Sequence, residues 1–169
     1  MKKVICFLVM LIGIASFASA ADQVFFELNG GDWSYPGIFA KVGWMHFWNN
    51  EKIGFIGDVS YYNKSFIVKH ENDEIVRTIT DRTHNIGLAA GIVFNNMGFK
   101  GVLRTSEYIK LKGLWQTSTA LLPIVPVLDL GFKLDVFFVE KTAFSAGLGL
   151  EISAGLPSLY ALLGMKFTL

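Results

Sequence analysis

The sequence predicts an all-β fold, an antiparallel up-and-down β-barrel of about eight strands, and three observations support this prediction. Apolar and polar residues alternate with a period of two along several segments, as in strands with one apolar and one polar face. Short connections alternate with long ones along most of the chain. Hydrophobic residues make up 52% and charged residues 17% of the sequence. No segment beyond the first 20 residues has the apolar run of a membrane helix, so strands must bury this surplus in a core or in lipid.

The first 20 residues are predicted to be a cleavable signal peptide. "MKKVICFLVMLIGIASFASA" has two lysines, an apolar run over residues 4 to 17, and the small residues Ala18-Ser19-Ala20 that signal peptidase requires. A membrane anchor is the weaker interpretation, because the run is shorter than the roughly 20 apolar residues that span a bilayer. We therefore expect one domain, residues 21–169.

Composition excludes several kinds of chemistry. Cys6 lies inside the predicted signal peptide, so the mature chain has no cysteine for a disulfide or a thiolate. Loss of Lys2 and Lys3 takes the basic residues from 15 to 13 against 14 acidic ones, a net charge of −1 that does not suggest nucleic acid. The three histidines are scattered, and "HENDE" lacks the ligand spacing of a calcium loop, so we expect no metal and no cofactor.

The first half of the chain fits the strand pattern less cleanly than the second. Asn and Gly in "WNNEKIG" and "FNNMGF" favour tight turns, because both residues tolerate positive φ. In "SFIVKHENDEIVRTIT", β-branched runs flank a polar turn, which indicates an extended hairpin over 64–82. Strands are predicted over 22–29, 37–48, 53–63, 83–95 and 98–105.

The segment 106–126 is predicted to be a loop. Pro123 and Pro126 argue against a regular central strand, because proline cannot donate to the ladder of a sheet. An additional strand pair in this segment remains the alternative.

The last three strands alternate most clearly. "VLDLGFKLDVFF", "TAFSAGLGLEIS" and "YALLGMKFTL" each place large apolar residues on one face and small, polar or charged residues on the other. Short hairpin connections, 139–141 and 154–158, separate these strands. One end of the predicted barrel therefore has tight turns and both termini, and the other has longer loops.

These features together resemble the small eight-stranded bacterial outer-membrane β-barrels, the class that includes the transmembrane domain of outer membrane protein A and the outer membrane proteins X and W. The resemblance covers essentially the whole mature chain, and it implies a monomer surrounded by outer-membrane lipid. It also implies that the barrel-assembly machinery reads the last strand through Leu163, Met165, Phe167 and Leu169. The sequence departs from that signal, since it ends on Leu169 and its aromatic residue stands two positions earlier.

Aromatic residues are expected at the membrane interfaces. Trp44 and Trp48 lie beside a tight turn, and Tyr61 and Tyr160 lie towards the loop end. A soluble lipocalin-like barrel is the alternative, but its outer face should carry more charge than these polar faces offer.

The polar faces predict a charged barrel interior. An eight-stranded barrel is nearly filled by side chains, and an unpaired buried charge is costly, so these groups should form ion pairs that plug the lumen. Phe39, Phe47, Tyr62 and Phe137 are expected to fill the room beside inward glycines such as Gly87 and Gly149. The predicted inward set is Glu27, Lys41, Asp58, Arg104, Asp129, Lys133, Asp135, Glu151 and Lys166.

The sequence favours a structural or surface-interaction role over catalysis and transport. A small channel for small or hydrophobic solutes is the first alternative. The second is a lipid A-modifying enzyme, as in some of the small outer-membrane barrels that the chain resembles, with His84 as base and Ser60 or Ser65 as nucleophile, although no catalytic motif is present. His46 is expected at an interface and His70 in a polar loop turn. The loops offer aromatic and mixed-charge surface to an extracellular partner.

Overall fold

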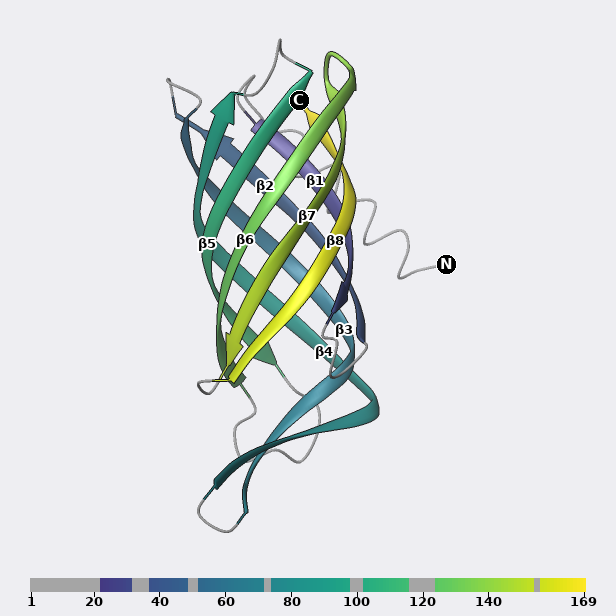
Figure 1. Ribbon diagram of the computed structural model, residues 1–169, viewed down its shortest axis with the longest axis vertical. Coiled ribbons are helices and arrows are strands. Elements are labelled where there is room, and N and C mark those ends of the chain that lie inside the picture. The colour runs from purple at the N-terminus through teal and green to yellow at the C-terminus, as the bar shows by residue number, and fades with distance from the viewer. Residues whose placement is uncertain are drawn as a thin grey trace.

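The chain forms one closed antiparallel β-barrel. The computed structural model describes residues 22–31, 37–48, 52–71, 74–97, 102–115, 124–153 and 156–169. Each of eight strands pairs with the next in the sequence, and β8 pairs with β1 (Figure 1). The predicted fold class is therefore confirmed. The strands are β1 (Asp22–Gly31), β2 (Gly37–Phe47), β3 (Ile53–Glu71), β4 (Glu74–Met97), β5 (Leu103–Trp115), β6 (Ile124–Val139), β7 (Thr142–Ser153) and β8 (Leu156–Thr168).

The barrel has two different ends. The connections β2–β3, β4–β5 and β6–β7 lie at one end, which we call the turn end, together with Asp22 and Leu169. The Leu169 amide there donates to the carbonyl oxygen of Asp22 at 3.0 Å, so the seam between β1 and β8 is bonded to its last position. The other four connections lie at the opposite end, the loop end, at the bottom of Figure 1.

The hairpin of β3 and β4 extends beyond the barrel at the loop end (Figure 1). Its register runs from Lys64 opposite Asp81 to Glu71 opposite Glu74, after an irregularity between Tyr62 and Lys64. The hairpin extension predicted for residues 64–82 is thus confirmed for the backbone.

The prediction for residues 98–126 was wrong in its boundaries. The predicted strand 98–105 is shifted, because β5 occupies Leu103–Trp115 and pairs along its length with β4 and β6. The predicted loop 106–126 therefore contains most of β5 and the start of β6. Pro126 is tolerated in β6 because β7 pairs with β6 only from Val127 onwards, so this edge needs no donor there.

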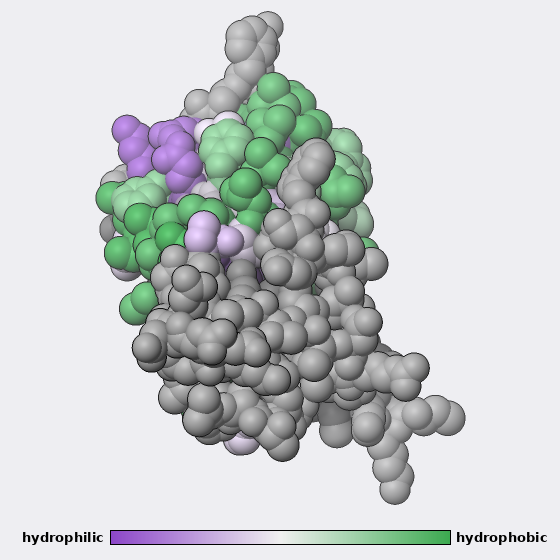
Figure 2. Space-filling view, turned by 60° about the horizontal axis from the view of Figure 1, so that its bottom comes forward, coloured by the Kyte–Doolittle hydropathy of each residue, from purple (hydrophilic) through white to green (hydrophobic). Residues whose placement is uncertain are grey.

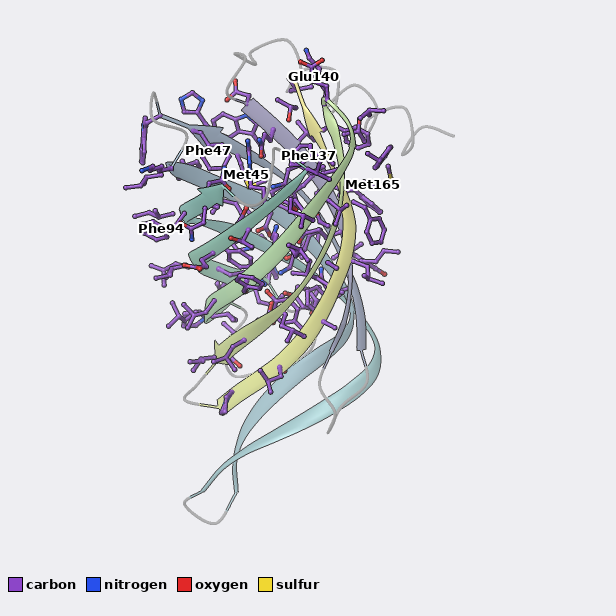
Figure 3. The ribbon with its side chains drawn as sticks, turned by 45° about the horizontal axis from the view of Figure 1, so that its top comes forward. Met45, Phe47, Phe94, Phe137, Glu140 and Met165 are labelled. Carbon is purple, nitrogen blue, oxygen red and sulfur yellow. The ribbon has the colours of Figure 1, made fainter. Side chains whose placement is uncertain are left out.

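The outer wall of the barrel is apolar. Seven of the eight strands contribute exposed large hydrophobic side chains to it, from Phe26 and Leu28 on β1 to Met165 and Phe167 on β8, and the outward side chains described on β2 are half-buried. Figure 2 shows part of this wall, with hydrophobic side chains over most of its coloured surface. At the turn end, Phe94 and Met165 are exposed, whereas Met45 and Phe47 are buried (Figure 3). No helix in the described ranges is long and apolar enough to span a membrane.

The inner face has two apolar clusters, one towards each end. The loop-end cluster consists of Phe39, Tyr62, Leu114, Val125, Val127, Tyr160 and Leu162. The turn-end cluster consists of Phe25, Met45, Phe47, Ile56, Val93 and Tyr108. Charged side chains occupy the lumen between and beside these clusters, which is where the candidate site lies.

Candidate functional site: the charge network of the lumen

The structure places the predicted lumen charges inside the barrel. Eight of the nine are buried, and Arg104 is half-buried, with its guanidinium carbon 5.4 Å from the centre of the Phe137 ring. Strand alternation explains this arrangement, since each charge stands at the parity that faces the axis. The eight buried members are Glu27, Lys41, Asp58, Asp129, Lys133, Asp135, Glu151 and Lys166.

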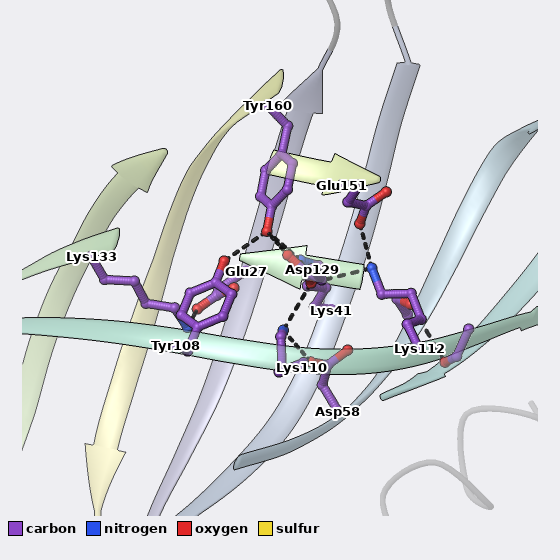
Figure 4. Close-up of polar contacts among 12 residues, drawn as sticks. Glu27, Lys41, Asp58, Tyr108, Lys110, Lys112, Asp129, Lys133, Glu151 and Tyr160 are labelled. Atoms are coloured by element: carbon purple, nitrogen blue, oxygen red, sulfur yellow. Dashed lines mark hydrogen bonds and ion pairs between the residues drawn. The ribbon is translucent and has the colours of Figure 1, made fainter. Parts of the chain in front are cut away.

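Asp129 on β6 is the centre of this network (Figure 4). Its Oδ2 lies 3.2 Å from Nζ of Lys41, 3.1 Å from Nζ of Lys110 and 3.3 Å from Nζ of Lys112. Its Oδ1 accepts a hydrogen bond of 2.5 Å from the hydroxyl of Tyr160. We call Asp129 and these four partners the Asp129 hub. It joins side chains from β2, β5, β6 and β8 across the lumen.

Two further carboxylates balance the lysines of the hub. Asp58 on β3 lies 2.6 Å from Nζ of Lys110. Glu151 on β7 pairs with Lys112 and accepts a hydrogen bond of 2.8 Å from the hydroxyl of Tyr62. Lys112 in turn donates to the Tyr62 hydroxyl at 2.6 Å. Three carboxylates thus face three ammonium groups, as a charge buried among apolar clusters requires.

Lys110 and Lys112 were missed by the sequence-based prediction. Both stand in the segment expected to be a loop, and both side chains are buried, at 1% and 3% exposure. The alternation of Ile109 and Leu111, which are exposed, with these lysines was the available signal. Pro123 and Pro126, which favour a loop, lie in the same segment and obscure this pattern.

The turn-end half of the lumen has separate ion pairs in place of a hub. Glu27 pairs with Lys133, and Asp135 pairs with Lys166. Asp135 also accepts a hydrogen bond of 2.6 Å from the hydroxyl of Ser145. We call the two ion pairs the turn-end pairs.

Several charges bond across the lumen although an opposite charge stands beside them. Glu27 on β1 is directly opposite Lys41 on β2 in the ladder. Glu27 nevertheless pairs with Lys133, and Lys41 reaches Asp129, 88 residues away in the sequence. The network therefore ties the β1–β2 hairpin to β6 and β8.

The room beside the inward glycines is filled differently from the prediction. A Cβ on Gly87 would overlap the Ser60 hydroxyl and lie 3.2 Å from Cδ of Lys112, and one on Gly149 would overlap the ring of Tyr160. A serine hydroxyl and a lysine stem beside Gly87, and a tyrosine ring beside Gly149, therefore occupy these places. Phe39, Phe47 and Tyr62 do face inwards, but in the apolar clusters.

Tyr160 also corrects a predicted interface residue. It was expected at the loop-end membrane interface, yet it is 4% exposed and bonds to Asp129. The reason is parity: Tyr160 shares a strand face with Lys166, whereas Leu163 and Phe167 face outwards. Tyr61 and Trp48 are exposed on the outer face, as expected for interface residues.

The candidate enzymatic residues do not form a site among the described side chains. The hydroxyl of Ser60 is buried in the lumen and donates to the carbonyl of Gly87 at 3.4 Å. His46 lies at the turn end, where its Nδ1 is 2.5 Å from Oδ1 of Asp22 and its ring stacks on Trp44. Among the described residues, no group of three potential metal ligands gathers. The side chains of His70, His84 and Ser65, and residues 1–20, lie outside the described part of the structure.

Comparison with family models gives no match, and no curated protein sequence matches the chain. Solved structures are similar at low identity. Neisserial surface protein A has a TM-score of 0.57 at 10% identity, covering 88% of this chain and 96% of that one. The closed barrel and its similarity to this solved structure together establish the architecture. The chain has the fold of the small eight-stranded outer-membrane β-barrels.

Two further solved structures share this fold but belong to proteins of different kinds. Ail, the attachment invasion locus protein of Yersinia pestis, in complex with the heparin analogue sucrose octasulfate, has a TM-score of 0.52 at 11% identity, covering 86% of this chain and 97% of that one. The outer membrane enzyme PagL has a TM-score of 0.50 at 11% identity, covering 87% of this chain and 99% of that one. The same architecture thus occurs in an attachment invasion locus protein and in an enzyme, and does not by itself assign a role.

Proposed function

We propose that this chain is a monomeric outer-membrane β-barrel of a Gram-negative-type envelope, with a plugged lumen and a structural or surface-interaction role. A signal peptide, residues 1–20, directs its export. It requires no cofactor and binds no nucleic acid.

The outer wall supports the membrane location. Exposed Leu, Ile, Val and Phe side chains on neighbouring strands would be unfavourable in water over so large an area. Closure of the barrel satisfies every strand edge, which a lipid environment demands. The outward face of β8 presents Leu163, Met165 and Phe167, which together with Leu169 are the residues that we propose the barrel-assembly machinery reads.

The observation that carries the non-transport role is the Asp129 hub. Its three lysines are balanced by Asp129 together with Asp58 and Glu151, and these groups cross the lumen between the loop-end and turn-end clusters. Ions would need to break these pairs to pass. The surface role would then belong to the loop end. There the β3–β4 hairpin extends beyond the barrel and could contact an extracellular partner.

Single-channel conductance of the refolded mature protein in planar bilayers tests this proposal, with heat-modifiability on a gel as the folding control. We expect a heat-modifiable band and no steady conductance. Steady conductance by the folded barrel would overturn the plug and favour the channel for small solutes. Release of fatty acid from lipopolysaccharide, abolished by His84→Ala, would overturn the non-enzymatic role.

A further inference from the structure

Glu107 is an unusual residue of the outer wall. Among the exposed side chains that the structure describes on the eight strands, it is the one acid or base. Its neighbours in the ladder are Phe94 on β4 and Phe132 on β6, both exposed hydrophobic residues. No hydrogen bond or ion pair joins the side chain of Glu107 to another described side chain. A carboxylate on a lipid-facing wall is unfavourable unless a partner or the interface accommodates it.

Two polar residues stand beside Glu107 on the same face. Thr105 lies two positions earlier on β5, and Asn96 of β4 is directly opposite Thr105 in the ladder. The amide of Asn96 and the hydroxyl of Thr105 are hydrogen-bond donors, whereas the carboxylate of Glu107 only accepts. We call Asn96, Thr105 and Glu107 the polar island. It combines donors and a negative charge within one small area of an apolar wall.

The depth of the island follows from strand geometry. Trp115, exposed at the loop end of β5, lies eight residues from Glu107. At a rise of about 3.3 Å per residue and a tilt near 45°, this separation spans about 19 Å along the barrel axis. The apolar band of such barrels is about 25 Å tall. With Trp115 at the loop-side boundary, Glu107 stands just inside the turn-side boundary, within reach of lipid headgroups.

We propose that the polar island binds the headgroup of a zwitterionic lipid with a primary ammonium group, in the leaflet at the turn end. The ammonium would donate to the Glu107 carboxylate, and the lipid phosphate would accept from Asn96 and Thr105. A quaternary ammonium has no N–H to donate, and an anionic headgroup without an amine would meet a repelling carboxylate. This inference rests on the proposed membrane location.

Lipid retention measured by native mass spectrometry tests the inference. The full mature protein is refolded into vesicles containing equal parts of phosphatidylethanolamine, phosphatidylcholine and phosphatidylglycerol, and then extracted in mild detergent. We expect one phosphatidylethanolamine to be retained in preference to the other two lipids. Glu107→Gln should reduce that preference roughly tenfold, the effect of losing one charge-assisted hydrogen bond.

Glu140→Gln is the matched control. It removes an exposed acid from the β6–β7 turn, outside the island, and should leave the preference unchanged. Equal retention of the three lipids, or a Glu107→Gln variant with the wild-type preference, would overturn the inference and leave the membrane location intact. A dimer of the wild-type protein that Glu107→Gln converts into monomers would also overturn the inference, because a second copy of the chain would then be the partner of Glu107. Failure of the folded chain to enter vesicles would instead overturn the proposed function.

Discussion

The two halves of the lumen neutralise their charges in different ways. In the loop-end half, Asp129 serves three lysines and a tyrosine, so that every member depends on the others. In the turn-end half, Glu27 and Asp135 each have one lysine partner. The hub should therefore respond to substitution as a unit, whereas the turn-end pairs should respond as separable interactions.

The most severe test of this difference is Asp129→Ala compared with Asp135→Ala. Removing one partner from a buried ion pair costs about 3–5 kcal/mol, and we expect Asp135→Ala within that range. Asp129→Ala should exceed it, because the side chains of Lys41, Lys110 and Lys112 all lose the same carboxylate. Urea unfolding in lipid vesicles measures both. Equal losses would show that the hub is no more cooperative than a single pair.

A milder perturbation removes only the tyrosine hydroxyl from the hub. Tyr160→Phe keeps the ring but deletes the hydroxyl that donates to Asp129, and should lower the free energy of unfolding by about 1.5–3 kcal/mol. Combined with Lys41→Met, the loss should be non-additive, because both groups contact Asp129. The same Tyr160→Phe change combined with Lys166→Met should add simply. Additivity in both combinations would contradict the cooperative hub.

Packing at the hub can be tested without altering any charge. Gly149→Ala would place a methyl group against Cζ of Tyr160, so the ring must shift from its present place beside Asp129. We expect a loss of about 1–3 kcal/mol, typical of an overfilled core. Gly113→Ala is the control, since its methyl group would lie at an ordinary 3.6 Å from the Ile124 side chain. Thermal unfolding in vesicles compares the two variants.

The smallest effect is expected from replacing a whole turn-end pair. Glu27→Leu together with Lys133→Met exchanges both charges for apolar groups of similar size, and such exchanges are commonly neutral or stabilising. We expect a change in unfolding free energy of about 1 kcal/mol or less. A loss as large as that of Asp135→Ala would show that the turn-end pairs, too, are part of an interdependent network.

Alternation in the sequence was sufficient to predict most of the strands, though not β5, and the direction in which most side chains point. Asp129 and Glu151 could be assigned to the inner face because each stands between large apolar residues in a clean period of two. The segment of β5 was harder to predict, since lysines at 110 and 112 and the following prolines resemble a loop. Because its two lysines are central to the hub, the hub was not predicted once Lys110 and Lys112 were assigned to a loop.

The pairing of the charges could not be predicted from the sequence. Glu27 and Lys41 are neighbours in the ladder, yet each finds its partner across the lumen. That choice depends on the length of each side chain, on the barrel diameter and on which neighbours are glycine. These quantities are set only when the barrel closes.

The surroundings of Tyr160 also bear on how such a barrel can evolve. Gly31 on β1 and Gly149 on β7 flank this tyrosine in the ladder, and a Cβ on Gly31 would lie 2.8 Å from its Cβ. A larger residue at Gly149 therefore requires a smaller side chain at position 160, and one at Gly31 requires glycine there; either replacement leaves Asp129 without its hydroxyl donor. The three positions on three adjacent strands are thus expected to vary together among descendants of this sequence, as a single inherited unit.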